Sequence, residues 1–257
     1  MFPSNQSSST RPVSTADLMR RYFISDLHLS PNQALIADGF KRFLHERCAD
    51  ADELYILGDF FDSWIGDDED DAFYRNIIAF LRAISSDGLK LYLMRGNRDF
   101  LLGEQFAQDS GVTLLAEPHR LRLGKLDALL MHGDSLCTDD KDYMAFRAQA
   151  RSAEWQAQVL GLPLAARRAL AEQMRSQSKT MNSNKAEDIM DVNADAVSAC
   201  MSEHRVSLLI HGHTHRPARH TLTGGERIVL GDWGAHAWYL RSEDESLTLH
   251  QFALAKD

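Results

Sequence analysis

The chain has 257 residues, 44% of them apolar, and a formal net charge of −9 at pH 7. This size and composition predict a globular protein with one sizeable core and room for an inserted subdomain, while the acidic balance argues against non-specific binding to nucleic acid. Three widely spaced cysteines without a C-x-x-C pair indicate a reducing compartment, and neither a membrane-spanning apolar run nor a secretion signal is expected.

The first part of the chain alternates predicted strands and helices. Residues 1–19 are mostly polar, and we expect a disordered tail there because so little apolar surface cannot offset the entropy of ordering it. Apolar side chains at helical spacing predict two helices that cover a sheet, one over Ile36 to Leu44 and one over Phe73 to Ile84. A third, short helix is expected at 100–110. Strands are expected at 20–25, 54–57, 91–94, 112–115, 119–123 and 126–131, with the second sheet completed by 206–210, 228–230, 237–240 and 247–252.

Five consecutive acidic residues, 67–71, precede the second predicted helix. Carboxylates stabilise a helix N-terminus, so we interpret this run as the solvated, acidic start of that helix. A supplementary cation site is the alternative, and we assign no ligands to it.

Strand signals disappear between residues 140 and 205, where the pattern predicts helices interrupted at 161–163 and 176–184. We interpret 140–205 as an inserted helical unit, so that residues 20–139 and 206–257 form the core. Residues 141–185 carry five Arg and three Lys against three acids, and apolar residues such as Trp155 and Leu162 lie among them. A basic, amphipathic unit of this kind is typical of a membrane surface. Two helices that bury their apolar stripes against each other fit the pattern equally well.

Residues with metal-binding chemistry follow five of the predicted strands. In an open α/β sheet the carboxyl ends of the strands meet at one edge, so we expect these side chains to converge. They outnumber the about four to six ligands of a single ion, which predicts two adjacent ions that share a bridging carboxylate. Taken alone, the histidine-rich turn could also be a solvated loop. The residues are Asp26 and His28 after the first strand, Asp59, Asn97 and His132 after the next three, and His211, His213 and His215 at the last.

The ordered motifs Asp-x-His, Gly-Asp, Gly-Asn, His and Gly-His-x-His, between residues 21 and 250, resemble the calcineurin-like metallophosphoesterase superfamily. The resemblance implies an α/β fold, a sandwich of two mixed β-sheets flanked by helices, with the insertion as a lid. It also implies two Mn²⁺ per chain, although ligand chemistry alone leaves Fe and Zn open. By this resemblance Asp26, His28 and His215 hold one ion, Asn97, His132 and His213 hold the other, Asp59 bridges them, and His211 is no ligand.

One position departs from most of that superfamily, where Gly-Asn is followed by His and here by Arg98. The segments 96–103, 56–59, 64–68, 132–140 and 189–193 are similar to the family of UDP-2,3-diacylglucosamine hydrolases of lipid A synthesis. This resemblance implies that the diphosphate of UDP-2,3-diacylglucosamine is cut to UMP and 2,3-diacylglucosamine 1-phosphate, lipid X. Arg98 would stabilise the transition-state charge beside a metal-bound hydroxide. The implied substrate contacts are Asn97, Arg98, Asp140, Ser178, Asn182, Lys185 and His213, of which Ser178, Asn182 and Lys185 share one helix face.

The resemblance further implies a lid that encloses acyl chains and a peripheral position on the cytoplasmic face of the inner membrane. We expect a monomer and no nucleic-acid partner. A soluble nucleotide or phosphoprotein phosphoesterase is the first alternative, for which Gly-Asn-His and no basic lid would be expected. A metal-free interaction scaffold on this fold is the second, and it would have lost metal ligands.

Overall fold

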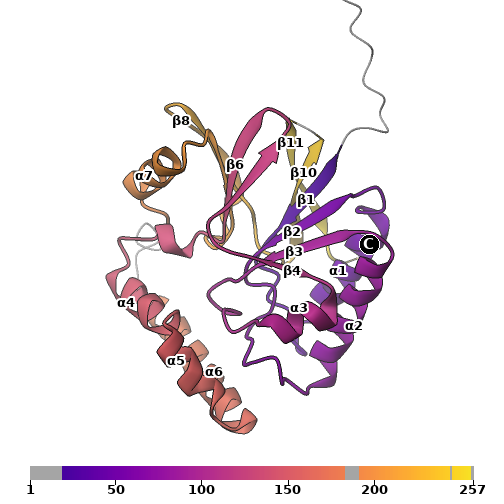
Figure 1. Ribbon diagram of the computed structural model, residues 1–257, viewed down its shortest axis with the longest axis vertical. Coiled ribbons are helices and arrows are strands. Elements are labelled where there is room, and N and C mark those ends of the chain that lie inside the picture. Colours follow the sequence, from indigo (N-terminus) through magenta and orange to yellow (C-terminus); the bar gives the residue numbers. More distant parts are fainter. Residues whose placement is uncertain (1–18, 183–190, 244, 256–257) are drawn as a thin grey trace, which may run out of the picture.

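The structure is a computed structural model that describes residues 19–182, 191–243 and 245–255. It contains two packed β-sheets with helices on their outer faces (Figure 1). The strand orders are β11-β10-β1-β2-β3-β4 and β5-β6-β7-β9-β8, and each sheet mixes parallel and antiparallel pairs, which confirms the predicted α/β sandwich. The placement of strands 237–240 and 247–252 in the second sheet was wrong, because β10 pairs with β1 and extends the first sheet. The strands are β1 (Arg20–Ile24), β2 (Glu53–Leu57), β3 (Lys90–Met94), β4 (Thr113–Leu115), β5 (His119–Leu123), β6 (Leu126–Met131), β7 (Leu208–His211), β8 (Ala218–Leu222), β9 (Gly225–Val229), β10 (His236–Glu243) and β11 (Ser246–Ala253).

Two predicted helix boundaries are wrong. The helix expected to start at residue 100 begins at Glu104, because Phe100, Leu101 and Leu102 form a buried turn before it. The break expected at residues 176–184 does not occur at its start, since one helix continues to Asn182. The helices are α1 (Ala34–Glu46), α2 (Ala72–Ser86), α3 (Glu104–Ser110), α4 (Lys141–Ala150), α5 (Ala153–Leu160), α6 (Leu164–Asn182) and α7 (Ala194–His204), with a 3-10 turn, η2 (Asp134–Leu136), after β6.

Strict alternation along the central strands distributes side chains between the layers of the core. In β1, Phe23 joins the cluster between the two sheets, whereas its neighbours Tyr22 and Ile24 join the cluster beneath α1 and α2. The same alternation in β7 sends Ile210 between the sheets and Leu209 toward α7. Successive residues of a strand point to opposite faces, so one apolar run fills two layers at once.

The inserted segment divides into two parts. Helices α4, α5 and α6 project beyond the sandwich (Figure 1), and we call them the lid. Helix α7 instead buries Val197 and Met201 against Leu129 and Leu209 of the second sheet. Within the predicted insertion 140–205, α7 thus packs as an outer layer of the sandwich.

Candidate metal centre and adjoining cavity

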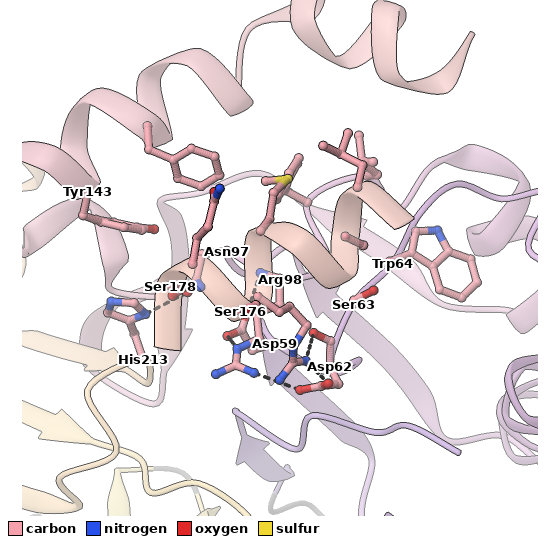
Figure 2. A pocket seen from close by; sticks show the side chains of 18 of the residues that line it. Asp59, Asp62, Ser63, Trp64, Asn97, Arg98, Tyr143, Ser176, Ser178 and His213 are labelled. Atoms are coloured by element: carbon pink, nitrogen blue, oxygen red, sulfur yellow. Dashed lines mark hydrogen bonds and ion pairs between the residues drawn. The ribbon is translucent and has the colours of Figure 1, made fainter. Parts of the chain in front are cut away.

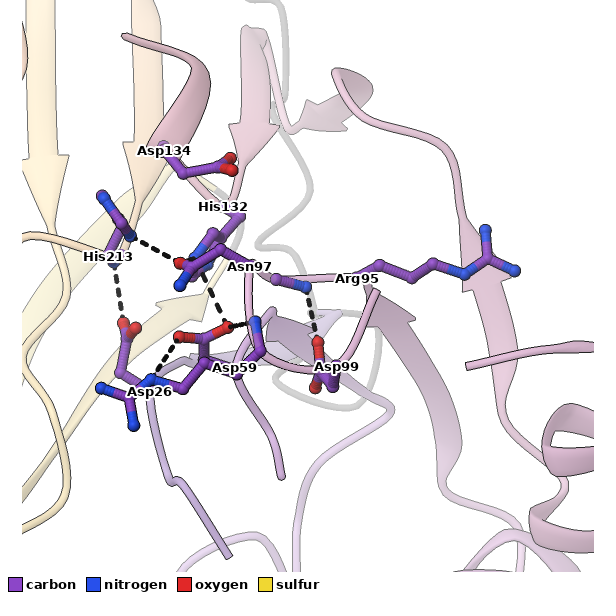
Figure 3. Close-up of polar contacts among 12 residues, drawn as sticks. Asp26, Asp59, Arg95, Asn97, Asp99, His132, Asp134 and His213 are labelled. Carbon is purple, nitrogen blue, oxygen red and sulfur yellow. Dashed lines mark hydrogen bonds and ion pairs between the residues drawn. The ribbon is translucent and has the colours of Figure 1, made fainter. Parts of the chain in front are cut away.

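The predicted metal ligands lie together because each one follows the carboxyl end of a strand. Metal-competent atoms of Asp26, His28 and His215 lie within 4.8 Å of one another, and so do those of Asp26, Asp59 and His132. Figure 3 shows side chains from both sheets meeting at this edge of the sandwich. Asp26 belongs to both groups, so they form one continuous cluster.

Asn97 joins the cluster between two imidazole rings. Its Oδ1 lies 2.8 Å from Nε2 of His132 and 2.8 Å from Nδ1 of His213. The other ring nitrogen of His132, Nδ1, lies 2.9 Å from the carbonyl oxygen of Leu57, which can only accept, so Nδ1 carries a proton. In the singly protonated ring, the form that can bind a metal ion, the lone pair of Nε2 is directed at the amide oxygen of Asn97. An arrangement of facing acceptors suits a cation between them.

Asp59 lies at the middle of the cluster. Its Oδ2 is 3.2 Å from Nε2 of His28, and its Oδ1 is 3.7 Å from Nε2 of His132. Asp26 offers a further acceptor, because its buried Oδ1 has no hydrogen-bond partner among the described residues and lies 3.4 Å from Nε2 of His215. A buried carboxylate oxygen without a donor is costly unless a cation binds it. The donors present therefore fit two divalent ions with Asp59 between them.

Charge pairing in the cluster shifts several pKa values. Burial would raise the pKa of Asp59, but His132, His28 and Arg98 outweigh burial and hold it well below its usual range. Burial would lower the pKa of His132, but Asp59 and Asp26 outweigh burial and raise it to about 9. Burial lowers the pKa of His213 to about 4, so that ring is neutral at pH 7 and offers a lone pair. Carboxylates that stay ionised in a buried cluster attract positive charge, and this favours the binding of divalent cations.

Backbone strain is concentrated at the same residues. Asp26, His28, Asp59, His213 and His215 have φ between 50° and 68°, in the left-handed region. This conformation costs a residue with a Cβ about 1–2 kcal/mol, and among the described residues one other non-glycine shows it. Strain of this kind persists where the surrounding structure enforces it, typically at functional sites.

Glycines make the close approach of the loops possible. A Cβ on Gly96 would lie 2.1 Å from Oδ1 of Asp59, and a Cβ on Gly212 would lie 2.3 Å from Oδ2 of Asp26. Both distances are far below van der Waals contact, so the glycines of the Gly-Asn and Gly-His motifs leave room for the two central carboxylates.

Two carboxylates outside the predicted set hold these loops, one of them, Asp99, fully buried. Asp99 accepts hydrogen bonds from the backbone N–H groups of Gly96 at 2.7 Å and Phe60 at 2.8 Å, which joins the loops after β2 and β3 (Figure 3). Glu117 accepts one from the N–H of His132 at 2.7 Å. We did not predict either role, although Asp99 lies directly beside the predicted motif.

A cavity of about 1010 Å³ opens between the cluster and the lid. Its polar end includes Asp59, Asn97 and His213, while much of the rest is apolar. Lid residues contribute to that apolar lining, among them Phe146, Trp155, Val159, Leu170 and Met174, opposite Trp64 and Phe100 of the core. A cavity with this division suits a ligand that carries both phosphate and hydrocarbon.

Arg98 lies at the polar end and is held by two carboxylates. Its backbone N–H donates to Oδ1 of Asp59 at 2.8 Å, its Nε lies 3.4 Å from Oδ2 of Asp59, and its Nη1 donates to Oδ1 of Asp62 at 2.8 Å. Arg175 of α6 approaches the same Asp62 from the lid and pairs with its Oδ2. Figure 2 shows Arg98 and Asp62 beside Asp59 beneath the lid helices. Neither Asp62 nor Arg175 was predicted, although Arg175 lies one helical turn before Ser178.

Of the other predicted substrate contacts, two lie at the cavity, and the side chains of the other two lie outside the part that the structure describes. Asp140 and Ser178 line the cavity, and Asp140 also caps α4 by accepting from the N–H of Tyr143 at 3.1 Å. Asn182 ends α6, but its side chain lies outside the described part, as does the whole of Lys185. His211 is buried and neutral, since burial lowers its pKa to about 3.

The acidic run lies at the start of α2 as expected, and Asp68, Asp70 and Asp71 are exposed, but most of its carboxylates also bind protein donors. Asp71 does cap α2, accepting from the N–H of Phe73 at 2.7 Å. The other carboxylates face protein donors: Asp67 accepts from backbone N–H groups at the start of α3, and Asp68, Glu69 and Asp70 pair with arginines of α6. Sequence periodicity could not reveal that oppositely charged segments about 100 residues apart meet.

The charge of the insertion is thus balanced largely inside the protein, where we had expected an external partner. All five arginines of residues 141–185 contact the core. Arg147 pairs with Asp134, Arg151 donates to the carbonyl of Gly96, Arg167 pairs with Asp68, Arg168 with Glu69 and Asp70, and Arg175 with Asp62.

Comparison with known proteins identifies close relatives over most of the chain. A family model described as calcineurin-like phosphoesterase matches residues 19–217. A protein from Cellvibrio japonicus named UDP-2,3-diacylglucosamine hydrolase is 52% identical and covers 91% of this chain and 99% of its own. Its namesake from Chromohalobacter salexigens is 52% identical, covering 89% and 95%. A solved archaeal phosphodiesterase is 11% identical, covers 91% of this chain and 99% of its own, and has a TM-score of 0.47.

Proposed function

The chain belongs to the calcineurin-like phosphoesterase family, and within it to the UDP-2,3-diacylglucosamine hydrolases, and from this premise we propose that it hydrolyses the diphosphate of UDP-2,3-diacylglucosamine. The products are UMP and 2,3-diacylglucosamine 1-phosphate, in lipid A biosynthesis. The observation that carries the proposal is the cavity, which joins the carboxylate and imidazole cluster to an apolar chamber under the lid.

Two Mn²⁺ are the cofactors that we propose. Asp26, His28 and His215 hold one, Asn97, His132 and His213 hold the other, and Asp59 bridges them, which the unpartnered oxygen of Asp26 and the convergence on Asn97 support. Two adjacent divalent ions supply an activated water and neutralise charge on phosphate oxygens.

Arg98 binds the phosphates and takes no part in proton transfer. A guanidinium stays protonated at any working pH, so it cannot act as a general acid, but its planar fork can hold phosphate oxygens in pairs. A departing phosphate needs little protonation, whereas a departing alkoxide would need a proton. Arginine at this position therefore suits a diphosphate substrate.

The lid encloses the acyl chains in the apolar part of the cavity. Ser178, from α6, and Asp140, at the start of α4, contribute polar contacts at its rim. Asn182 and Lys185 complete this set in our proposal.

The protein acts as a peripheral monomer at the cytoplasmic face of the inner membrane. None of the helices in the described ranges is long and apolar enough to cross a bilayer. The turn between α5 and α6 presents Leu160 and Leu162, which are 43% and 41% exposed. Two exposed leucines at the tip of the lid would insert into the interfacial region beside the acyl substrate.

The test is a substrate panel assayed with the purified, manganese-loaded protein. UMP release from UDP-2,3-diacylglucosamine should exceed release from UDP-N-acetylglucosamine and UDP by at least about a hundredfold, and a phosphopeptide should not be cleaved. Comparable rates on the unacylated nucleotides would instead favour the soluble phosphoesterase, and retention of a lipid ligand without turnover would favour the scaffold.

A further inference from the structure

Two guanidinium groups lie on the two sides of Asp62. Arg98, from the core, donates through Nη1 to Oδ1 at 2.8 Å. Arg175, from lid helix α6, pairs through Nη1 with Oδ2 and donates to the backbone carbonyl of Asp62 at 2.8 Å. One carboxylate therefore holds together two cationic groups that would otherwise repel each other.

Arg175 differs from Arg167 and Arg168, the other arginines of α6. Arg167 also lines the cavity, but it is 4% exposed and its donors bind Asp68 and the carbonyls of Ile65 and Leu162. Arg168, two turns earlier on α6, pairs with Glu69 and Asp70 and does not line the cavity. Arg175 lines the polar end of the cavity together with Arg98. Each of these two guanidiniums uses Nη1 on Asp62, and its Nη2 donors make no hydrogen bond to any of the described residues.

We propose that Arg175 is a second phosphate-binding residue, which with Arg98 determines specificity for a diphosphate over a monophosphate. Two planar forks separated by one carboxylate match a ligand that carries two adjacent phosphates, because each fork can hold oxygens of one phosphate. Asp62 is the positioning residue that sets both forks before the substrate arrives. The inference rests on the proposed function, since it concerns the same cavity.

Arg175 remains accessible to a ligand, because its side chain is 41% exposed. Partial burial nevertheless lowers the pKa of its guanidinium, and Asp59 only partly compensates. A cation in that position gains from an anionic ligand. Because Arg175 comes from the lid, the diphosphate would bind between the lid and the core.

The experiment measures the binding of two nucleotides to the manganese-loaded protein by isothermal titration calorimetry. They are UMP and α,β-methylene-UDP, in which a methylene group replaces the oxygen between the two phosphorus atoms and prevents hydrolysis. Arg175→Ala should weaken binding of the diphosphonate about tenfold and binding of UMP less than threefold. The matched control is Arg168→Ala, on the same helix, which should change neither affinity by more than about twofold. Arg175→Lys keeps the charge and most of the stem and should lose about threefold on the diphosphonate.

Asp62→Asn separates positioning from general destabilisation. It should weaken diphosphonate binding in the wild-type background and have a clearly smaller effect combined with Arg175→Ala, because one of its two partners is then gone. Equal losses for both nucleotides in Arg175→Ala, or wild-type affinities in Arg175→Lys and Arg175→Ala, would overturn the inference. Should the wild-type protein fail to hydrolyse UDP-2,3-diacylglucosamine, the proposed function itself would be lost, and that assay is independent of the titrations.

Discussion

Arg98 shows how one side chain can define the leaving group. It occupies the position after the metal-binding amide and is held by Asp59 and Asp62 at 3.4 Å and 2.8 Å. Those contacts orient the guanidinium plane before any substrate binds. Replacing the guanidinium of Arg98 by the ammonium of lysine keeps the positive charge and removes the paired N–H donors, so it separates the contribution of geometry from that of charge.

Arg98→Lys is expected to lower kcat/KM for the diphosphate substrate at least tenfold, about 1.4 kcal/mol of transition-state stabilisation. The charge remains, but the paired N–H donors are lost. Steady-state kinetics with the metal content verified for each preparation would measure this. Near wild-type turnover by Arg98→Lys would return Arg98 to a structural role.

Asp59 is the residue on which metal binding should depend most. Manganese that binds only the folded state stabilises it, by about 2.7 kcal/mol when free metal is at a hundred times Kd. A chelator should therefore lower the Tm of the wild-type protein and added Mn²⁺ should restore it, whereas Asp59→Ala should lose most of this response and its activity. Asp109→Ala, which changes an acidic residue on α3, is the control. An Asp59→Ala protein that still gains the full stabilisation would show that the bridge is misassigned.

Among the elements, α6 is the one whose placement depends most on charge. Its propensity weakens after residue 175, where Ser, Thr and Asn accumulate, yet it continues to Asn182. Arg167 anchors its first half: it is 4% exposed, pairs with Asp68, and donates to the carbonyls of Ile65 and Leu162 at 2.7 and 3.0 Å. The hydrogen bond to Arg167 lowers the pKa of Asp68 from its ordinary 3.8, so this pairing stabilises above that pH and is lost only as pH falls through the lowered value.

Arg167→Ala should destabilise the lid far more than Arg168→Ala. The first leaves two carbonyls without their donor, at about 1–3 kcal/mol, whereas the second removes an ion pair with a 41% exposed arginine, worth about 0–1 kcal/mol. Hydrogen exchange of α6 amides at neutral pH would measure both, with α1 amides as the internal reference. If the α6 amides of both variants kept the protection that they have in the wild-type protein, the lid would be held by its apolar contacts alone.

For the whole molecule, the internal pairing of the lid arginines changes the expected basis of membrane attachment. Arginines already paired with core carboxylates have little free charge to offer an anionic surface. The exposed leucines at the tip of the lid remain available.

Leu160→Ser combined with Leu162→Ser should therefore reduce the fraction of protein that sediments with vesicles of bacterial inner-membrane lipids at least threefold. Leu35→Ser is the matched control, since Leu35 is 52% exposed but lies on α1. A loss that is the same in Leu35→Ser, or absent in the double variant, would refute attachment through the lid tip.

The sequence by itself determined the layers of this protein and the edge at which its chemistry gathers. Uninterrupted apolar runs in β1 and β7 require two buried faces, so the sheets must be covered on both sides. Polar residues placed directly after those strands must then lie at one edge. These are local properties, set by the period of a strand and the direction of the chain, and a single sequence contains them.

Only the tertiary structure decided which charges meet. Several contacts join segments that lie 36 to 113 residues apart in the sequence: Asp68 pairs with Arg167, Asp62 binds both Arg98 and Arg175, and Asp99 binds the loop after β2. They also depend on the direction in which a buried side chain points. No periodicity encodes such contacts, because an ion pair depends on the distance between two atoms in space. That distance is set by how the lid packs on the core, which is a property of the folded molecule.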